Sequence, residues 1–256
     1  MPDESPAGNG ASAHDTLTSR SPDRDESGWR TPTVPAKSGS REREPAAPPE
    51  PPPDCGRCPR LVAFRKRNRE CFPDFYNAAV PSFGDPHARL LIVGLAPGLK
   101  GANRTGRPFT GDYAGEILYH ALIDAGLAQG EYLARADDGL VLHDVMITNA
   151  VRCVPPENRP SPAEIARCRP YLRSRIESLP QLRAILALGR IAHDSVVASL
   201  GGVRARHPFT HGGAHRFDGL VLIDSYHCSR YNMNTGRLTK SMFAEVLTQA
   251  IARARA

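Results

Sequence analysis

Four short apolar segments recur along the chain, separated by stretches in which apolar residues follow helical spacing. Segments rich in Leu, Ile and Val, with no polar alternation, are typical of strands that are buried on both faces. We predict these strands at Leu90–Gly94, Val145–Val151, Ala184–Leu188 and Leu220–Ser225.

Helices are predicted between and after these strands. They cover Tyr113–Ala125, a segment that begins at Ser161, Ile191–Leu200 and Thr239–Ala254. In the second of them Ser161 and Glu164 can form a capping box, and Pro170 is expected to end or kink the helix. Strands that alternate with helices predict an α/β fold, here a single-domain α/β/α sandwich with a central four-stranded parallel sheet.

Composition divides the chain at residue 54. Residues 1–54 hold 11 of the 24 prolines and few aliphatic side chains, a composition that buries too little apolar surface to form a core. We therefore expect a disordered tail at 1–54 and one folded domain at 55–256. The chain shows neither a signal-peptide-like apolar segment nor a run of about 18 apolar residues, so we expect a soluble, cytoplasmic protein.

Charge divides at the same point. The tail has 6 Lys and Arg against 10 Asp and Glu, and the remainder has 27 basic against 17 acidic residues. A cationic domain attracts polyanions, of which nucleic acid is the commonest, although the same balance also serves solubility.

In open α/β sheets, ligands bind beyond the carboxyl ends of the strands. The loops expected there begin at Gly94, Asn149, Gly189 and Tyr226, and three of them are long and polar. Their cations are Lys100, Arg104, Arg107, Arg152, Arg159, Arg230 and Arg237. We expect these seven side chains to form a basic rim, which suits a phosphate backbone better than a small neutral ligand.

The first of these loops, "GLAPGLKGANRTGRPFTGD", is unusually long and glycine-rich. It contains neither the G-x-x-x-x-G-K-[ST] phosphate loop nor the G-x-G-x-x-G dinucleotide fingerprint. The chain also lacks a G-x-S-x-G nucleophile elbow. These absences argue against the commonest nucleotide-binding and hydrolase motifs of α/β proteins.

Four of the six cysteines form two pairs. Cys55 and Cys58 lie in a C-x-x-C sequence, and Cys153 and Cys168 bracket "CVPPENRPSPAEIARC". Four thiolates are enough for a tetrahedral zinc ion or an iron-sulfur cluster, and spacing does not choose between them.

Three blocks of sequence together resemble the uracil-DNA glycosylase superfamily, specifically its family 5, also called type B. The blocks are "GLAPGLKGANRTGRPFTGDYAG", "ITNAVRCVPPENRPSPAEI" and "SYHCSRYNMNTGRLT", and the resemblance extends over residues 55–250. It implies a monofunctional DNA repair enzyme that hydrolyses the N-glycosidic bond of uracil and other deaminated or damaged bases and leaves an abasic site. It further implies double-stranded DNA as the partner, a monomeric bacterial protein without membrane attachment, and a 4Fe-4S cluster.

The resemblance assigns roles to residues of the first two blocks. Phe109 matches the aromatic ring that stacks on the flipped base, and Asn149 the carboxamide that reads its polar edge. Gly94 and Ala96 belong to the same binding region. Asp112 matches the acid that stabilises the sugar cation and orients water, although an Asp before a helix is also an ordinary N-cap. The "GLAP" segment itself, where other branches have a polar or acidic residue, contains none.

The third block supplies His227, which matches the donor to the departing base. The chain has Cys228 after it where many superfamily members have proline. The following loop has the composition of a strand-separating wedge, with Tyr231, Asn232 and Met233 as candidates. His193, His207, His211 and His215 receive no role.

The resemblance also selects Cys55, Cys58, Cys153 and Cys168 as the cluster ligands. Cys71 and Cys228 are then left as non-ligands. Two other functions remain open: a non-catalytic protein of the same fold that binds damaged DNA, and an iron-sulfur enzyme acting on a free nucleoside or nucleotide.

Overall fold

The four predicted strands form the parallel centre of one sheet. In the computed structural model, which describes residues 48–256, β2 (Leu90–Gly94) lies between β5 (Val145–Asn149) and β6 (Ala184–Leu188), and β8 (Leu220–Ser225) pairs with β6. All three pairings are parallel, which confirms the predicted parallel core. β5 ends two residues earlier than predicted, at Asn149.

Two short antiparallel strands extend this sheet at its edges. β1 (Phe83–Gly84) pairs with β5, and β7 (Ala214–Phe217) pairs with β8, so the sheet is six-stranded in the order β1-β5-β2-β6-β8-β7. The edge strands were not predicted. β1 has only two residues, and β7 has the half-polar sequence AHRF, so neither produces an apolar run. A separate hairpin joins β3 (Ala128–Gln129) and β4 (Val141–Leu142).

The four predicted helices are confirmed with small changes at their ends. They are α3 (Tyr113–Asp124), α4 (Pro162–Glu177), α5 (Arg190–Ser199) and α7 (Lys240–Arg255). The capping box of Ser161 and Glu164 is present. The expected end at Pro170 is wrong, because α4 continues through this exposed residue. The shorter or unpredicted helices are α1 (Pro59–Cys71), α2 (Ala102–Thr105), α6 (Arg230–Asn234) and the 3-10 turns η1 (Pro156–Asn158) and η2 (Arg204–Arg206).

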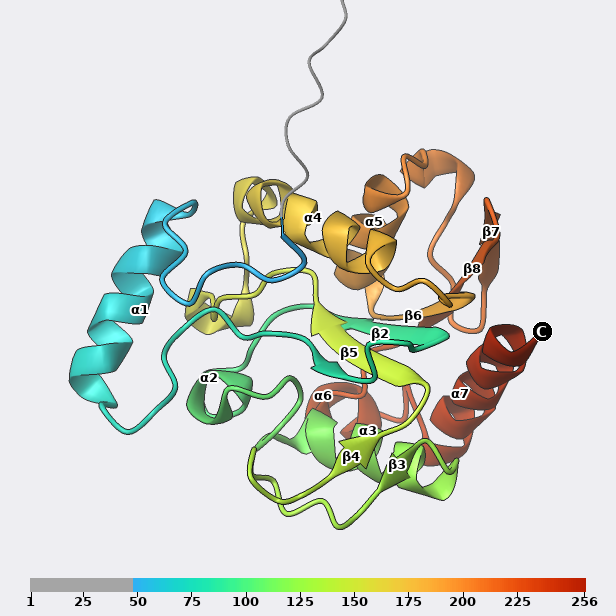
Figure 1. Cartoon of the computed structure of the whole chain (residues 1–256), viewed down its shortest axis with the longest axis horizontal. Coiled ribbons are helices and arrows are strands. Elements are labelled where there is room, and N and C mark those ends of the chain that lie inside the picture. The colour runs from blue at the N-terminus through green and yellow to red at the C-terminus, as the bar shows by residue number, and fades with distance from the viewer. Residues whose placement is uncertain (1–47) are drawn as a thin grey trace, which may run out of the picture. The chain divides into compact units, whose positions relative to one another are not determined.

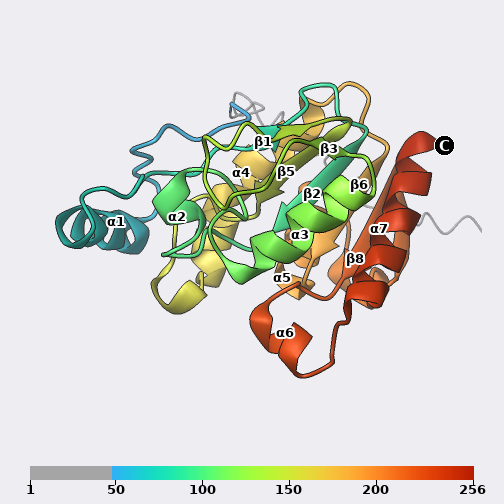
Figure 2. The same cartoon turned by 90° about the horizontal axis from the view of Figure 1, so that it is seen from below.

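Helices cover both faces of the sheet, as the sandwich prediction requires. α4 and α5 lie on one face, and α3 and α7 on the other (Figures 1 and 2). Side chains alternate along each strand, so Leu91 and Val93 of β2 join the core beneath α4 and α5. Leu90 and Ile92 join the core beneath α3 and α7. No helix of the described part of the chain is long and apolar enough to cross a membrane.

Contacts of the domain begin before Cys55. The carboxylate of Glu50 accepts a hydrogen bond from Arg152 Nη1 at 2.6 Å and one from the Ser82 amide at 3.1 Å, and it also pairs with Arg175. The expected tail therefore includes residues that pack on the domain, while its first 47 residues lie outside the described range.

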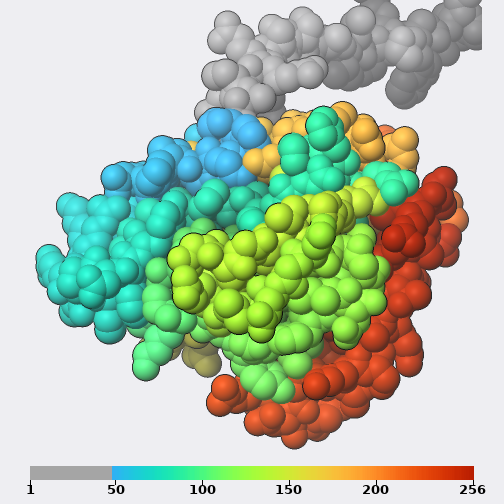
Figure 3. Space-filling model, turned by 60° about the horizontal axis from the view of Figure 1, so that its bottom comes forward, coloured from blue at the N-terminus to red at the C-terminus, as the bar shows by residue number. Residues whose placement is uncertain are grey.

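The segment that connects α3 to β5 packs beside α3. In Figure 3 this segment is yellow-green, and it lies against the green surface that includes α3.

Candidate active site and cysteine site

A cavity of about 660 Å³ opens at the carboxyl end of the parallel sheet. The loops after β2, β5 and β8 line it, as the rule for open α/β sheets predicts. Five of the predicted site residues, Ala96, Phe109, Asp112, Asn149 and His227, lie in its wall. The structure therefore brings together residues that are separated by up to 131 positions in the sequence.

Asn149 enters this cavity from the end of β5. It lies opposite Gly94 of β2 in the sheet register and is 3% exposed. Its carboxamide makes no hydrogen bond with any described residue, which leaves a donor and an acceptor free in a nearly buried position. A Cβ atom on Gly94 would lie 2.5 Å from Asn149 Oδ1 and 2.5 Å from Phe109 Cζ. Gly94 thus does not line the cavity itself but lets both side chains lie over the end of β2.

Phe109 contributes an aromatic ring to the wall. The residue is 6% exposed and has a φ angle of +53°, a left-handed conformation that is rare for bulky side chains. Its ring lies 5.9 Å from the ring of His227, centroid to centroid, with 25° between their planes.

Asp112 combines two features that the sequence analysis treated as alternatives. One carboxylate oxygen, Oδ1, caps α3 by accepting a hydrogen bond from the Gly115 amide at 3.0 Å. The other, Oδ2, accepts none from the described residues and lies against the turn after "GLAP". A Cβ atom on Gly101 would be 2.5 Å from this oxygen, and one on Gly98 would be 3.3 Å from it. Capping therefore still leaves one anionic oxygen available to the cavity.

His227 follows the end of β8 and lies in the wall of the same cavity. Neither ring nitrogen has a hydrogen-bond partner among the described residues, whereas its backbone oxygen accepts a bond of 2.8 Å from Asn232 Nδ2. Burial lowers the pKa of this imidazole, and the negative charge of Asp112 opposes the shift only in part. The imidazole is therefore neutral near pH 7 and carries one N–H donor. The next residue, Cys228, is fully buried with its Sγ 3.5 Å from the Ala114 oxygen in α3, which anchors the loop.

The predicted basic rim is only partly present. Arg107 and Arg152 are 4% and 1% exposed. Arg107 binds both oxygens of Asp138 at 2.6 Å, and Arg152 binds Glu50. These two cations are structural, and their inclusion in the rim was wrong. The other five predicted cations keep exposed side chains, and Lys100 and Arg230 line the cavity.

The predicted wedge loop is a short helix. Ser229 caps α6, and Tyr231 on that helix is 72% exposed. The guanidinium of Arg230 lies 5.1 Å from the ring centroid of Tyr113. Sequence reasoning missed another residue of the cavity, Asn158, which follows Glu157 with φ angles of +55° and +54°. Asn tolerates this conformation, so "PPEN" signals a tight turn but not the direction of the side chain.

The remaining histidines form a separate group near β8. His193 Nδ1 lies 2.7 Å from Asp224 Oδ1, and its Nε2 lies 2.8 Å from the His207 carbonyl oxygen. A carboxylate and a carbonyl oxygen both accept hydrogen bonds, so this arrangement favours the doubly protonated form of His193. His215 Nε2 lies 3.1 Å from Asp224 Oδ2, and His211 accepts a hydrogen bond from the Tyr226 amide. Burial opposes the charge of His193, but the hydrogen bond and charge of Asp224 outweigh it and raise its pKa.

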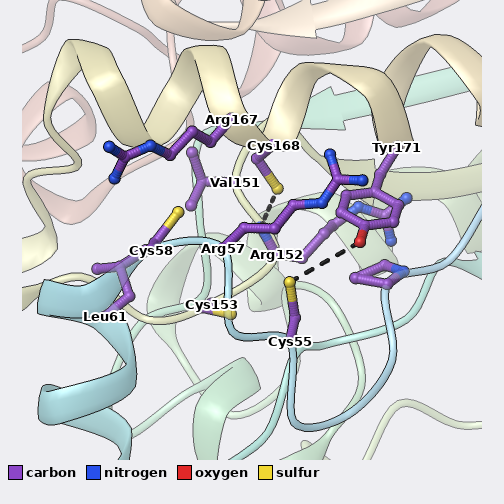
Figure 4. A pocket seen from close by; sticks show the side chains of 11 residues that line it. Cys55, Arg57, Cys58, Leu61, Val151, Arg152, Cys153, Arg167, Cys168 and Tyr171 are labelled. Carbon is purple, nitrogen blue, oxygen red and sulfur yellow. Dashed lines mark hydrogen bonds between the residues drawn. The ribbon is translucent and has the colours of Figure 1, made fainter. Parts of the chain in front are cut away.

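The four paired cysteines line one apolar pocket (Figure 4). Cys55 and Cys58 precede α1, Cys153 follows β5, and Cys168 belongs to α4. Hydrogen-bonding groups approach three of the sulfurs. They are Arg65 Nη1 at 3.6 Å from Cys153, the Arg152 amide at 3.4 Å from Cys168 and the Tyr171 hydroxyl at 3.8 Å from Cys55.

This donor set fits a metal group that is larger than a single ion. Burial raises the thiol pKa of Cys153 to about 12 and that of Cys168 to about 11, so a cation is needed to stabilise both thiolates. Tetrahedral zinc requires thiolate sulfurs about 3.8 Å apart. Within the described range, no three of the four sulfurs lie within 4.8 Å of one another. Cys71 is exposed and Cys228 lies in the other site, so neither joins this group.

The fold and cavity define an α/β protein with a ligand site at the ends of its parallel strands. Comparison with known proteins identifies its family. The profile of the uracil DNA glycosylase superfamily matches residues 81–250. The type-5 uracil-DNA glycosylase of Thermus thermophilus is 46% identical over 202 residues, covering 77% of this chain and 92% of the relative.

Two further relatives have the same name. The type-5 uracil-DNA glycosylase of Pyrobaculum aerophilum is 43% identical over 204 residues, with 78% of this chain and 88% of the relative covered. The type-5 uracil-DNA glycosylase of Mycobacterium leprae is 44% identical over 206 residues, covering 77% of this chain and 90% of the relative. The chain belongs to the uracil-DNA glycosylase superfamily, and its similarity to type-5 members confirms the resemblance seen in the three sequence blocks.

Proposed function

We propose that this protein is a DNA repair glycosylase that hydrolyses the N-glycosidic bond of uracil, and of other deaminated or damaged bases, and leaves an abasic site. One observation carries the proposal beyond family membership. Three polar groups that have no hydrogen-bond partner among the described residues, the Asn149 carboxamide, the His227 imidazole and Asp112 Oδ2, share one cavity with the Phe109 ring. Free hydrogen-bonding groups beside an aromatic face match the needs of a flipped pyrimidine.

Each group takes one task in the proposed reaction. Phe109 stacks on the flipped base, and Asn149 recognises its polar edge by donating one hydrogen bond and accepting another. The glycosidic bond then breaks with negative charge developing on the base, and the neutral His227 donates its N–H to uracil O2. Asp112 Oδ2 stabilises the positive charge on the sugar and orients the attacking water, while Oδ1 keeps the side chain fixed on α3.

Cys55, Cys58, Cys153 and Cys168 are the residues that would hold a 4Fe-4S cluster. Such a cluster would act as a structural staple, linking the segment before α1 to the loop after β5 and to α4. No electron transfer is required for base hydrolysis. Arg65 and Arg152 direct donors at two of the sulfurs, which is the type of contact that stabilises ligating thiolates.

We further propose that the protein acts as a monomer on double-stranded DNA in the bacterial cytoplasm. Lys100 and Arg230 line the cavity and would contact phosphates on either side of the flipped nucleotide. Helix α6 is the candidate wedge that occupies the space left in the duplex. Its one aromatic side chain, Tyr231, is exposed.

The direct test uses a duplex that contains one uracil opposite guanine. The purified protein should release free uracil, and the strand should break only after alkali or heat, because the enzyme leaves an abasic site. The His227→Ala variant should lower the single-turnover rate roughly 100-fold while binding the duplex normally. Intact uracil after many enzyme equivalents would contradict the proposal.

The same experiment separates the two alternatives. A protein that only binds damaged DNA would retain the duplex without releasing base, and Asp112→Ala would change neither property. An enzyme for free nucleosides would hydrolyse deoxyuridine, and excess undamaged DNA would not compete. Steep salt dependence of binding would instead indicate phosphate contacts.

The cluster has its own test. Protein purified without oxygen should contain about four iron atoms per chain, as expected for the proposed ligand set, and should absorb visible light. Cys168→Ser should lose iron and colour, whereas Cys71→Ser, a change at an exposed cysteine outside the pocket, should keep both. One zinc per chain without iron would contradict the assignment.

A further inference from the structure

The turn that carries Phe109 is held in an unfavourable backbone conformation. The residue has a φ angle of +53° although its side chain is large, and it is almost fully buried. A bulky residue persists in this region only where surrounding contacts impose it. The contacts that fix this turn therefore decide where the Phe109 ring faces.

Tyr132 spans the turn with a single hydroxyl group. The hydroxyl donates a hydrogen bond to the Phe109 carbonyl oxygen at 3.2 Å and accepts one from the Gly111 amide at 3.2 Å. Tyr132 is 7% exposed, and burial raises its pKa to about 12, so the phenol stays protonated and able to donate near pH 7. The hydroxyl thus links the carbonyl group of the strained residue to the amide two residues further along the turn.

A buried cation holds the Tyr132 ring in place. The guanidinium of Arg107 lies 5.8 Å from the centroid of this ring and 5.2 Å from that of Tyr119, and the two rings stack 4.7 Å apart. The Tyr119 hydroxyl donates to the Pro108 oxygen at 2.7 Å, one residue before Phe109. The turn is thus held at successive carbonyl groups by two stacked tyrosines.

Asp138 fixes the segment from which Tyr132 projects. Its carboxylate binds Arg107 through two bonds of 2.6 Å and accepts bonds from the Leu133 and Leu140 amides at 3.2 and 3.1 Å. Burial raises the pKa of Asp138, but the hydrogen bonds from Arg107 and these amides outweigh it and hold the pKa at about 2. Arg107 therefore faces an ionised carboxylate near pH 7.

Helix α3 closes the turn from the other side. A Cβ atom on Gly115 would collide with the Phe109 carbonyl oxygen and lie 2.6 Å from the Tyr132 hydroxyl. Glycine at this position allows the helix to approach closely enough for the hydrogen bonds to form. Helix α3 therefore packs directly against the two groups that form this hydrogen bond, the Phe109 carbonyl and the Tyr132 hydroxyl.

We propose that Tyr132 is a positioning residue for base binding: its hydroxyl locks the Phe109 turn so that the aromatic ring faces the flipped base. The proposal rests on the proposed glycosylase function, because it assigns Phe109 the stacking role. Tyr132 itself does not line the cavity and acts only through Phe109.

A double-mutant cycle tests this coupling. Tyr132→Phe keeps the ring but removes both hydrogen bonds, and we expect the half-saturating protein concentration in single-turnover uracil release to rise about tenfold. The maximal rate should change less than threefold, because stacking stabilises the ground state and transition state alike. In the Phe109→Ala background the same change should have less than a twofold effect.

Tyr76→Phe is the matched control, because among the described residues that hydroxyl bonds the Ala79 oxygen, outside the turn, and no other group. This variant should leave both the half-saturating protein concentration and the maximal rate unchanged. Equal effects of Tyr132→Phe with and without Phe109 would overturn the proposal, since they would indicate general destabilisation. A crystal structure of Tyr132→Phe provides an activity-independent readout: φ of Phe109 should become negative, and an unchanged turn would overturn the proposal even if the wild type released no uracil.

Discussion

Two Asp-His pairs lie near the carboxyl ends of the parallel strands, and they differ in one respect. In the cavity, Asp112 and His227 keep hydrogen-bonding atoms that no described residue engages. Near β7 and β8, Asp224 and His193 use all of theirs, and Asp224 binds His215 as well. Burial lowers the pKa of His227, whereas Asp224 raises that of His193 against the effect of burial.

Residue type alone therefore does not distinguish a site from a structural network. A buried polar group that is paired stabilises the fold, and one that is left free in a cavity is available to a ligand. The comparison predicts that equivalent changes in the two pairs have different consequences. Changes near His227 should affect chemistry, and changes near His193 should affect stability.

Isosteric substitution of the two acids gives the largest expected contrast. Asp112→Asn should lower the single-turnover rate of uracil release roughly 1,000-fold, or about 4 kcal/mol, because the carboxylate charge at the sugar is lost. Stability should change by less than about 0.5 kcal/mol, because Asn caps a helix as well as Asp. A rate within tenfold of wild type would show that Asp112 serves only as the cap.

The matched change in the other pair should act on unfolding. Asp224→Asn leaves a buried imidazolium without its counter-charge and should lower the free energy of unfolding by about 3 kcal/mol, measured in urea. The folded variant should retain a single-turnover rate within tenfold of wild type. Unchanged stability would mean that His193 is not charged in the native protein.

The two histidines should produce opposite pH dependences. The reaction rate should fall at low pH as His227 gains a proton, and the stability should fall at high pH as His193 loses one. The rate should stay level from pH 8 down to the ordinary histidine pKa of about 6.5 and fall only below it, because the pKa of His227 is lowered. The stability supplied by His193 should be complete below about pH 6.5 and disappear as the pH rises through its raised pKa. In His193→Gln, the urea concentration at the unfolding midpoint should no longer decrease over this pH range. An unchanged pH dependence in that variant would contradict the assignment.

The smallest effect concerns exposed cations near the two pairs. Lys100 lines the cavity, and Arg216 lies on β7 beside the histidine group. Lys100→Ala should weaken duplex binding severalfold and reduce the salt dependence by about one phosphate contact. Arg216→Ala should change neither, and equal losses in both variants would indicate diffuse charge attraction instead of a defined DNA face.

The sequence predicted the parts of the fold that depend on local pattern. The four parallel strands consist mainly of apolar residues, and the capping box at Ser161 is a local motif. β7 was missed because its alternating AHRF sequence is short and half-polar. α1 was missed because only Leu61, Arg65 and Asn68 are buried along it, so its apolar stripe is weak.

The sequence indicated which residues belong to the site but not how their side chains are arranged. Motif blocks indicated Phe109, Asp112, Asn149 and His227, and strand order explains why their loops meet. Pairing over long sequence distances was not visible: Arg107 finds Asp138 31 residues away. For the same reason, charge alone placed Arg107 on the surface when it is buried.

The most direct test is a crystal structure with a duplex carrying 2′-fluoro-2′-deoxyuridine, whose fluorine slows formation of the sugar cation. The account predicts a flipped uracil stacked on Phe109, hydrogen-bonded to the Asn149 carboxamide, with its O2 facing His227 and its sugar facing Asp112 Oδ2. A uracil that remains in the helix, or that binds away from these four side chains, would contradict it.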